Sequence, residues 1–321
     1  MLNKEILIKY FEDGITEKGH EKIGTEHEKF VFNKNDYSLI PYRGEQSISA
    51  LLESFIQDDW KPKYEGDNII ALTKENASIT LEPGGQFELS GAPLVTIHET
   101  CREINNHLQF VKSIEEKMNI GFLGVGFLPI EKLDVVPHVP KKRYSEIMRP
   151  YMKKLGGLGL DMMHRSCTVQ ANFDYISELD MKKKIMVSAA LQPIVTGLFA
   201  NSPFLEGQLN GFQSYRGYVW TKTDNDRTGI LRSMVGENFS FEEYVDYALK
   251  VPVYSIIRDG NYINCLDYNF EDLMNNKSHE IKAEDITLDD WTDHLSTIFT
   301  EVRLKTYIEM RGADAGSYRS L

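Results

Sequence analysis

The chain has 321 residues, of which 41% are hydrophobic and 26% are charged, as is usual for a globular protein with a core of normal size. Its formal net charge of −12 argues against a nucleic-acid-binding surface, which needs a basic stripe to displace phosphate counterions. No apolar run approaches the roughly 20 residues that span a bilayer, and the first residues lack the layout of a secretion signal. We therefore expect no nucleic-acid partner and no membrane.

Three cysteines, Cys101, Cys167 and Cys265, lie far apart in the sequence and have no metal-ligand spacing. An odd and sparse set of cysteines suits a reducing cytosol, so we predict a cytoplasmic protein. The sequence contains no internal repeat, low-complexity tract or flexible linker. We therefore expect residues 1–321 to form a single domain.

Six segments have the apolar spacing of amphipathic helices, with a stripe of core residues on one side. They are Lys4–Phe11, Ser47–Ile56, Thr96–Met118, Met181–Ala200, Phe241–Leu249 and Leu288–Ile298.

Extended segments lie between these helices, and in each of them apolar and polar residues alternate. The polar faces carry Ser78, Thr80 and Glu82, then Gln86, Glu88 and Ser90 after the turn Pro83-Gly84-Gly85, then Thr168, Gln170, Asn172 and Asp174, and finally Glu301 and Arg303. Alternation of this kind is typical of an antiparallel sheet with one buried face. The alternative is a polar face that simply meets water, but such faces are normally rich in Lys and Thr. We predict an α+β fold in which an antiparallel sheet lines the site and helices pack on its other face.

The strand around Glu26 and Glu28 is the clearest candidate for a metal-binding element. Residues i and i+2 of a strand share a face, so the two carboxylates project side by side and repel each other unless a cation lies between them. Magnesium prefers hard oxygen ligands and often takes only one or two carboxylates beside nucleotide phosphates. Glu82 and Glu88 on the predicted hairpin would extend this acidic wall. His27 points to the opposite face and is interpreted as structural.

Two arginine-containing segments follow, one around Arg216 and one around Arg227. Arginine forks suit carboxylates and phosphates, so these segments would hold an anionic substrate against metal-bound ATP. The alternative is a surface loop with ordinary arginines. Further on, Glu309 and Arg311 form either a structural ion pair or part of the site. The glycine-rich stretch 121–126 lacks the order of a dinucleotide-binding motif, and close strand packing explains it better.

Taken together, these motifs resemble the plant and proteobacterial class of glutamate–cysteine ligases. The resemblance runs in order from about residue 20 to the end of the chain. It rests on Gly24-Thr25-Glu26-His27-Glu28-Lys29-Phe30, the stretch from Leu81 to Gly91, Thr168-Val169-Gln170, Phe199-Ala200-Asn201-Ser202-Pro203-Phe204, Asp226-Arg227-Thr228-Gly229, Glu301-Val302-Arg303-Leu304-Lys305 and the stretch from Tyr307 to Asp314.

The resemblance implies a glutamine synthetase-like carboxylate–amine ligase fold and the synthesis of γ-glutamylcysteine, the first step of glutathione production. ATP would phosphorylate the γ-carboxylate of glutamate, and the cysteine amine would attack the acyl phosphate, with Mg²⁺ neutralising charge on the phosphates. The residues carried over by the resemblance are Glu26, Glu28, Glu82, Glu88 and Glu301 for metal, Gln170, Asn172, Arg227 and Arg303 for nucleotide, Arg143, Arg216 and Thr168 for substrate, and Arg216 and Arg303 for catalysis.

The sequence also departs from the family pattern. Gly217 and Tyr218 replace the usual Ser and His after the arginine, and Lys222 reverses a charge near the site. Family members continue for about another hundred mainly helical residues, so the chain is either a fragment or a shortened lineage. Two alternatives to the ligase therefore stay open: a γ-glutamyl ligase that uses another amine, and a truncated relative without catalysis.

Overall fold

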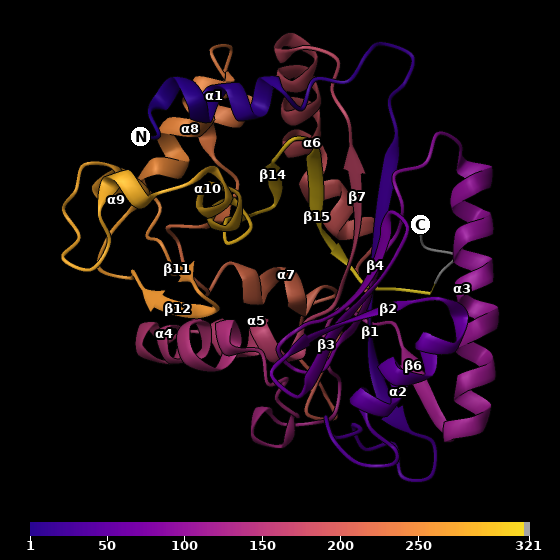
Figure 1. Ribbon diagram of the computed structural model, residues 1–321. Coiled ribbons are helices and arrows are strands. Elements are labelled where there is room, and N and C mark those ends of the chain that lie inside the picture. Colours follow the sequence, from indigo (N-terminus) through magenta and orange to yellow (C-terminus); the bar gives the residue numbers. More distant parts are fainter. Residues whose placement is uncertain (318–321) are drawn as a thin grey trace.

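The computed structural model describes residues 1–317, and one large antiparallel sheet lies at its centre (Figure 1). The sheet has nine strands in the order β14-β15-β7-β1-β5-β4-β3-β2, with β6 paired to the far half of β1. These strands are β1 (Ile23–Asn33), β2 (Lys61–Glu65), β3 (Asn68–Lys74), β4 (Ala77–Leu81), β5 (Phe87–Ser90), β6 (Ile120–Leu123), β7 (Thr168–Phe173), β14 (Val302–Leu304) and β15 (Ile308–Asp314).

Among residues 1–317, three small two-stranded sheets lie outside the large one. They pair β8 (Phe204–Leu205) with β9 (Gln208–Leu209), β10 (Thr228–Gly229) with β13 (Phe299–Thr300), and β11 (Ser255–Arg258) with β12 (Asn261–Asn264).

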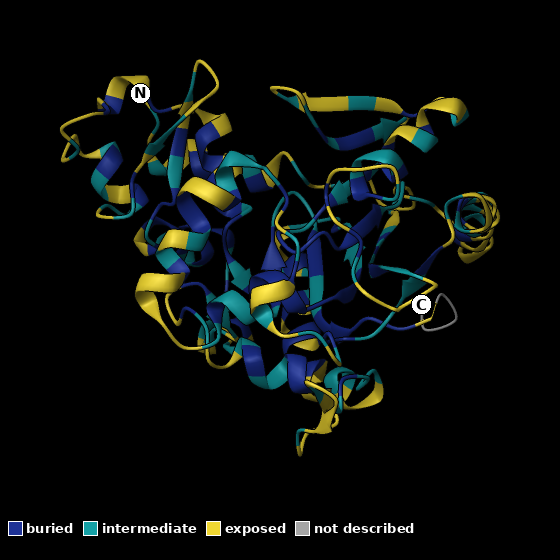
Figure 2. Ribbon diagram, turned by 90° about the horizontal axis from the view of Figure 1, so that it is seen from below, coloured by how far each residue is buried: buried dark blue, intermediate teal, exposed yellow. Residues whose placement is uncertain are grey.

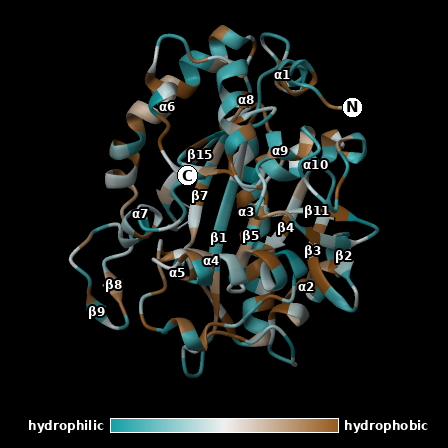
Figure 3. Cartoon of the chain, turned by 90° about the vertical axis from the view of Figure 1, so that its left-hand side faces the viewer, coloured by the Kyte–Doolittle hydropathy of each residue, from teal (hydrophilic) through white to brown (hydrophobic). Residues whose placement is uncertain are grey.

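Strand β1 holds the centre of the sheet, where its hydrophilic residues form a teal band between more apolar neighbours (Figure 3). Its first half pairs with β7 on one side and β5 on the other, so that Glu26 lies opposite Gln170 and Glu28 lies opposite Glu88. The predicted hairpin of β4 and β5 is confirmed, and Gly85 adopts the positive φ of 83° that this turn requires. Polar side chains from four separate strands therefore share one face.

The opposite face of the sheet is covered by α2 (Ile48–Phe55), α3 (Ile97–Met118) and α6 (Glu178–Leu198). Leu51 and Leu52 of α2 share an apolar cluster with Ile79 and Leu89, which point away from the polar face. Local chemistry fixes where these helices begin: the hydroxyl of their N-cap residue, such as Ser47 before α2, accepts a backbone N–H bond. The predicted helical layer on this face is confirmed.

Helices also surround the polar face of the sheet, which the sequence pattern did not predict. A π-helical turn (Arg143–Met148) leads into α4 (Arg149–Leu155), and α5 (Gly159–Arg165) and α7 (Tyr215–Trp220) follow; in Figure 1 these helices lie to the left of strands β1–β4. A second apolar core, which includes Phe11, Tyr244 and Trp291, joins α1 (Lys4–Glu12), α8 (Phe241–Lys250), α9 (Phe270–Met274) and α10 (Leu288–Leu295).

The centre of the molecule is buried, and the exposed residues lie on the outer helices and loops (Figure 2). No helix among residues 1–317 is long and apolar enough to cross a membrane.

Candidate active site

The polar face of the sheet forms the floor of a cavity of about 930 Å³. The floor carries the polar residues that the strand alternation predicted, Ser78, Thr80, Gln86, Glu88, Ser90, Thr168, Gln170, Asn172 and Asp174. Side chains from the surrounding helices and loops complete the walls, among them Tyr144, Met163, Arg216 and Trp220. The volume lies within the range of roughly 300–1,000 Å³ that small-molecule sites occupy.

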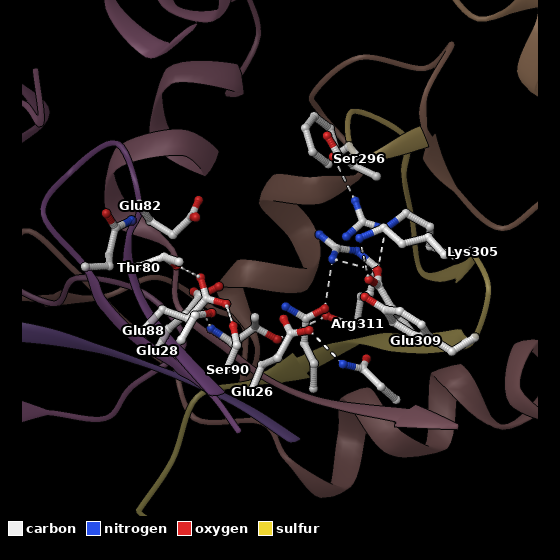
Figure 4. Close-up of a pocket in the computed structure, with 18 of the residues that line it drawn as sticks. Glu26, Glu28, Thr80, Glu82, Glu88, Ser90, Ser296, Lys305, Glu309 and Arg311 are labelled. Carbon is white, nitrogen blue, oxygen red and sulfur yellow. Dashed lines mark hydrogen bonds and ion pairs between the residues drawn. The ribbon is translucent and has the colours of Figure 1, made fainter. Parts of the chain in front are cut away.

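One end of the cavity is acidic and is formed by Glu26, Glu28, Glu82 and Glu88 (Figure 4). Glu88 accepts hydrogen bonds from the Thr80 hydroxyl at 3.0 Å and the Ser90 hydroxyl at 2.8 Å. Glu28 accepts one from the backbone N–H of Thr168 at 2.9 Å. The carboxylates are thus held in place by neutral donors, and their charges remain available to a ligand.

Burial of these carboxylates and their mutual repulsion both favour the protonated form. The pKa of Glu26 is raised to about 7, first by burial and then by the charges of Glu88 and Glu309. The pKa of Glu28 is raised well above its ordinary value by burial, Glu88 and Glu82, and that of Glu88 is raised by burial and Glu82. A cation placed among them would reverse this effect because it stabilises the ionised form.

The donor set fits a cation that shares its coordination with a substrate. Within residues 1–317, no group of three or more His, Cys, Asp or Glu side chains is arranged to hold a metal ion by itself. Magnesium commonly takes one or two carboxylates, with phosphate oxygens and waters completing its octahedron. The carboxylate pair of Glu28 and Glu88, directly opposite each other in the sheet, meets this smaller requirement.

The other end of the cavity is cationic and is built around the buried carboxylate of Glu309, which is 1% exposed. Arg303 donates from Nε to Glu309, Lys305 Nζ lies 2.9 Å from its Oε1, and Arg311 Nη1 lies 3.4 Å from its Oε2. Burial raises the pKa of Glu309, but the charges of Arg303, Lys305 and Arg311 outweigh burial and hold that pKa below its ordinary value. Three cations around one anion leave positive charge for a ligand.

Glu309 and Arg311 form an ion pair, and both side chains line the cavity. Arg311 also donates from Nη1 to the Gln170 side chain at 2.8 Å, which links the cationic end to the centre of the floor.

Two further arginines line the cavity where the sequence predicted substrate contacts. Arg216 on α7 is 3% exposed, donates to the Arg311 carbonyl at 2.9 Å, and has a buried Nε without a partner in the described chain. Its guanidinium lies 5.6 Å from the centre of the Trp220 ring. Arg143 donates to the Ser296 hydroxyl at 3.1 Å. Arg216 therefore keeps a donor available for an anion.

Among the predicted floor residues, Asn172 donates to Glu26 at 2.8 Å and thereby orients that carboxylate. Thr168 lines the cavity, but its hydroxyl donates to the Ala313 carbonyl at 2.7 Å and lies 3.1 Å from the Arg311 carbonyl oxygen. These bonds join β7 to β15, so the structure gives the Thr168 hydroxyl a structural task in place of the predicted substrate contact.

Arg227 does not reach the cavity. Within the described chain its guanidinium is 0% exposed, pairs with Asp224 at 2.7 Å and lies 4.0 Å from the centre of the Tyr254 ring. It also donates to the carbonyl of Pro252 at 2.9 Å. The structure therefore gives Arg227 a structural role between Asp224, Pro252 and Thr297 in place of the predicted phosphate contact.

Glu301 is also misplaced by the sequence argument. The chain bends between β13 and β14, so Glu301 and Arg303 do not share a face as alternation required. Glu301 Oε2 lies 2.2 Å from the position that a Cβ on Gly312 would occupy, and the side-chain nitrogen of Gln192 on α6 lies 1.9 Å from the same position. Within residues 1–317, Glu301 thus lies outside the set that lines the cavity, on the side of the sheet that α6 covers.

Sequence reasoning missed several cavity residues. Lys141 lies between the acidic end and the π-helical turn, donates to the Leu81 carbonyl at 2.8 Å, and has its pKa lowered by burial against the opposing effect of Glu82 and Glu88. Tyr144 donates to Glu82 at 3.4 Å. Neither residue belongs to a segment with a helix or strand period, so no local signal pointed to them.

The structural interpretation of the glycine-rich stretch is supported, and His27 points away from the candidate active site as predicted. A Cβ on Gly124 would lie 2.2 Å from the Gly316 carbonyl oxygen, so close packing excludes a side chain there. His27 faces α3 on the side of the sheet away from the cavity.

Comparison with known proteins places the chain in a family. The family model described as glutamate-cysteine ligase family 2 (GCS2) matches residues 22–320. The chain is 54% identical to the chloroplastic glutamate–cysteine ligases of Nicotiana tabacum and Medicago truncatula, and 52% identical to that of Arabidopsis thaliana. Each match covers 100% of this chain and 61–62% of the relative.

These names correct one prediction. The relatives are named as chloroplastic proteins, which contradicts the cytoplasmic location that we inferred from the sparse cysteines. Cysteine content reports the redox state of a compartment, and it does not separate reducing compartments from one another. The family itself is established by the match over nearly the whole chain. The chain belongs to glutamate-cysteine ligase family 2.

Proposed function

We propose that this chain catalyses the ATP-dependent ligation of the γ-carboxylate of L-glutamate to the amine of L-cysteine, which gives γ-glutamylcysteine. The observation that carries the proposal is the division of one cavity into an acidic end and a cationic end, in a chain more than 50% identical along its length to relatives named glutamate–cysteine ligase. We also infer the carboxylate–amine ligase fold of glutamine synthetase, which an antiparallel sheet under such a cavity supports.

The acidic end suits Mg²⁺, which when bound would neutralise charge on the transferred phosphoryl group. Glu28 and Glu88 are the central pair, and Glu26 and Glu82 flank them. The raised pKa values of Glu26, Glu28 and Glu88 mean that the surroundings poorly stabilise the ionised form of these carboxylates. Binding of a cation is therefore favoured by relief of repulsion as well as by attraction.

The cationic end suits the phosphates of ATP. Arg303, Lys305 and Arg311 share one carboxylate, Glu309, so their donors are fixed in position before a ligand arrives. Fixed donors of this kind stabilise charge that develops during phosphoryl transfer without reorganising. Gln170 and Asn172 lie on the floor between the two ends, where we place the junction of metal and nucleotide.

Glutamate would be held by Arg216 and Arg143, whose guanidinium groups suit carboxylates. A γ-carboxylate oxygen would attack the γ-phosphorus of ATP, and ADP would leave. The amine nitrogen of cysteine would then attack the acyl carbon, and phosphate would leave as the amine gives up its proton. The chain's part in these steps is to position the reactants and exclude water, which is the main source of catalysis in phosphoryl transfer.

ADP release tests this proposal. The chain is supplied with ATP, Mg²⁺ and glutamate, and ADP is measured with cysteine, with other amines, or with no amine. Release that depends on cysteine is expected. If ADP is released only with another amine, that amine is the acceptor in place of cysteine. If the chain neither releases ADP nor binds ATP, it is a non-catalytic relative.

The variant Glu28→Gln tests the metal assignment within the same assay. Loss of the carboxylate should abolish ADP release while the fold remains intact, because the amide keeps an acceptor for the Thr168 N–H. Glu45→Gln, at an exposed residue of a loop, is the matched control and should retain activity. Normal turnover in Glu28→Gln would remove this residue from the metal site.

A further inference from the structure

A second cavity, of about 400 Å³, lies on the opposite side of the sheet from the candidate active site, between the sheet and α3. Its floor is formed by His27 and Lys29 of β1, which alternate with Glu26 and Glu28, together with Phe87 and Leu89 of β5. Its roof is the middle of α3. Figure 1 shows α3 standing beside the sheet along its whole length.

A gap remains between α3 and the sheet because few residues of α3 are buried against the sheet. Only Thr100, Ile104, Val111 and Ile114 of its 22 residues are buried, and they leave the turn around His107 above the cavity. The remaining walls are apolar and aromatic, with Leu108 and Phe122 among them.

The cavity contains polar groups without partners. His27 is 7% exposed, and its buried Nε2 has no hydrogen-bond partner within residues 1–317. An unsatisfied buried donor or acceptor costs about 1–3 kcal/mol, so most such groups are paired in folded proteins. A hydrogen-bonding group of a bound ligand would give His27 Nε2 its missing partner.

The charges at this cavity are mainly positive. Lys29 is partly buried on the floor, and the described chain gives it no hydrogen bond or ion pair. Lys112 stands at the exposed rim. The acidic residue of the lining, Glu115, is engaged by Lys34 at 3.6 Å. An anion that entered here would meet Lys29 without a competing carboxylate on the floor.

The aromatic walls favour a flat ligand. The ring of His107 is nearly parallel to that of Phe87, at 19° and 6.0 Å between centres, and Phe122 meets Phe87 edge-on at 5.4 Å. A phosphate dianion would find too few donors among these apolar walls, because burying its charge costs more than one lysine returns. A carboxylate with a planar apolar body matches both the walls and the charge.

We propose that the cavity between α3 and the sheet binds a small monocarboxylate with a flat apolar body, its carboxylate held by Lys29 and His27 and its body packed beside the rings of Phe87, His107 and Phe122. This site is separate from the active site, and the strands that form its floor carry Glu26, Glu28 and Glu88 on their other face.

Benzoate is a suitable probe, and nuclear magnetic resonance of the 321-residue chain is a suitable measurement. The imidazole signals of His27 and His107 report the second cavity, and the indole N–H of Trp220 reports the active-site cavity. We expect saturable shifts of the two imidazoles at benzoate concentrations that leave the indole unmoved. Benzamide, which has the same shape without the charge, should bind at least about tenfold more weakly.

Variants at Lys29 test the contact. Lys29→Met, which keeps the apolar stem, should weaken benzoate binding about tenfold or more, and Lys29→Arg should restore it. Lys63→Met, on the exposed strand β2, is the control and should bind as the original chain does. Equal binding of benzamide, full binding by Lys29→Met, or shifts confined to the Trp220 indole would each overturn the proposal. None of these readouts needs turnover, so they stand or fall independently of the proposed ligase activity.

Discussion

Glu309 is the residue whose replacement should most clearly expose how the cationic end is built. Its carboxylate is 1% exposed and neutralises part of the charge of Arg303, Lys305 and Arg311. Glu309→Gln keeps the size of the side chain and removes its charge. The three cations then face one another without an anion.

The magnitude follows from the burial of the group. Removing one partner of a buried ion pair costs about 3–5 kcal/mol. Several hydrogen bonds survive the change, because Arg303 still donates to the Ser296 carbonyl at 2.9 Å and Arg311 to Gln170 at 2.8 Å. We therefore expect the free energy of unfolding to fall by about 3 kcal/mol, at the lower end of that range.

The pH dependence of this loss has a defined sign. The pKa of Glu309 is lower in the folded protein than in the unfolded chain, so its stabilising contribution is fully present above the unfolded value of about 4.5. It is lost as the pH falls below that value toward the folded pKa. The difference between the original chain and Glu309→Gln should therefore be constant near neutral pH and shrink in acid.

Urea unfolding followed by tryptophan fluorescence measures the effect, with Glu45→Gln as an exposed control that should unfold like the original chain. Sulfate should stabilise Glu309→Gln more than the original chain, because a bound anion replaces the missing charge. A variant as stable as the original chain at neutral pH, or a difference that grows in acid, would refute this account of the cationic end.

Three further predictions concern residues outside the central carboxylates. Arg227→Met should lower the free energy of unfolding by about 3–5 kcal/mol, because it leaves Asp224 buried and unpaired. The folded fraction of this variant should still bind ATP in equilibrium dialysis as tightly as the original chain does. Glu301→Gln should leave the Mg²⁺ dependence of ADP release unchanged, and a shifted Mg²⁺ requirement would return Glu301 to the metal site. Gly84→Ala should lower the melting temperature measured by circular dichroism, because the Cβ of the new alanine would lie 2.2 Å from the backbone oxygen of His164. An unchanged melting temperature would show that the turn can move.

Strand alternation predicted much of the site because it is a local property. Thr168, Gln170 and Asn172 of β7 line the cavity as the period of two required, and so does Asp174 directly after the strand. The same rule failed at Glu301, where a bend interrupts the strand, and a bend between two short strands leaves no mark in the hydrophobic pattern.

The residues that sequence reasoning misplaced depend on tertiary contacts. Arg227 carries the same chemistry as Arg216, and only the buried surroundings of its guanidinium show that it is structural. The sequence did contain one signal of this ion pair, because Asp224 lies only three residues before Arg227. Lys141 reaches the cavity through the path of an irregular segment, which no periodicity describes.

We infer that one face of the sheet divides into a metal-binding half and a phosphate-binding half. Electron paramagnetic resonance of Mn²⁺, used in place of Mg²⁺ with a non-hydrolysable ATP analogue, tests it without turnover. We expect Glu28→Gln to release bound Mn²⁺ while the analogue still binds, and Arg311→Met to weaken the analogue more than the metal. Equal Mn²⁺ binding in the original chain and in Glu28→Gln would contradict the claim.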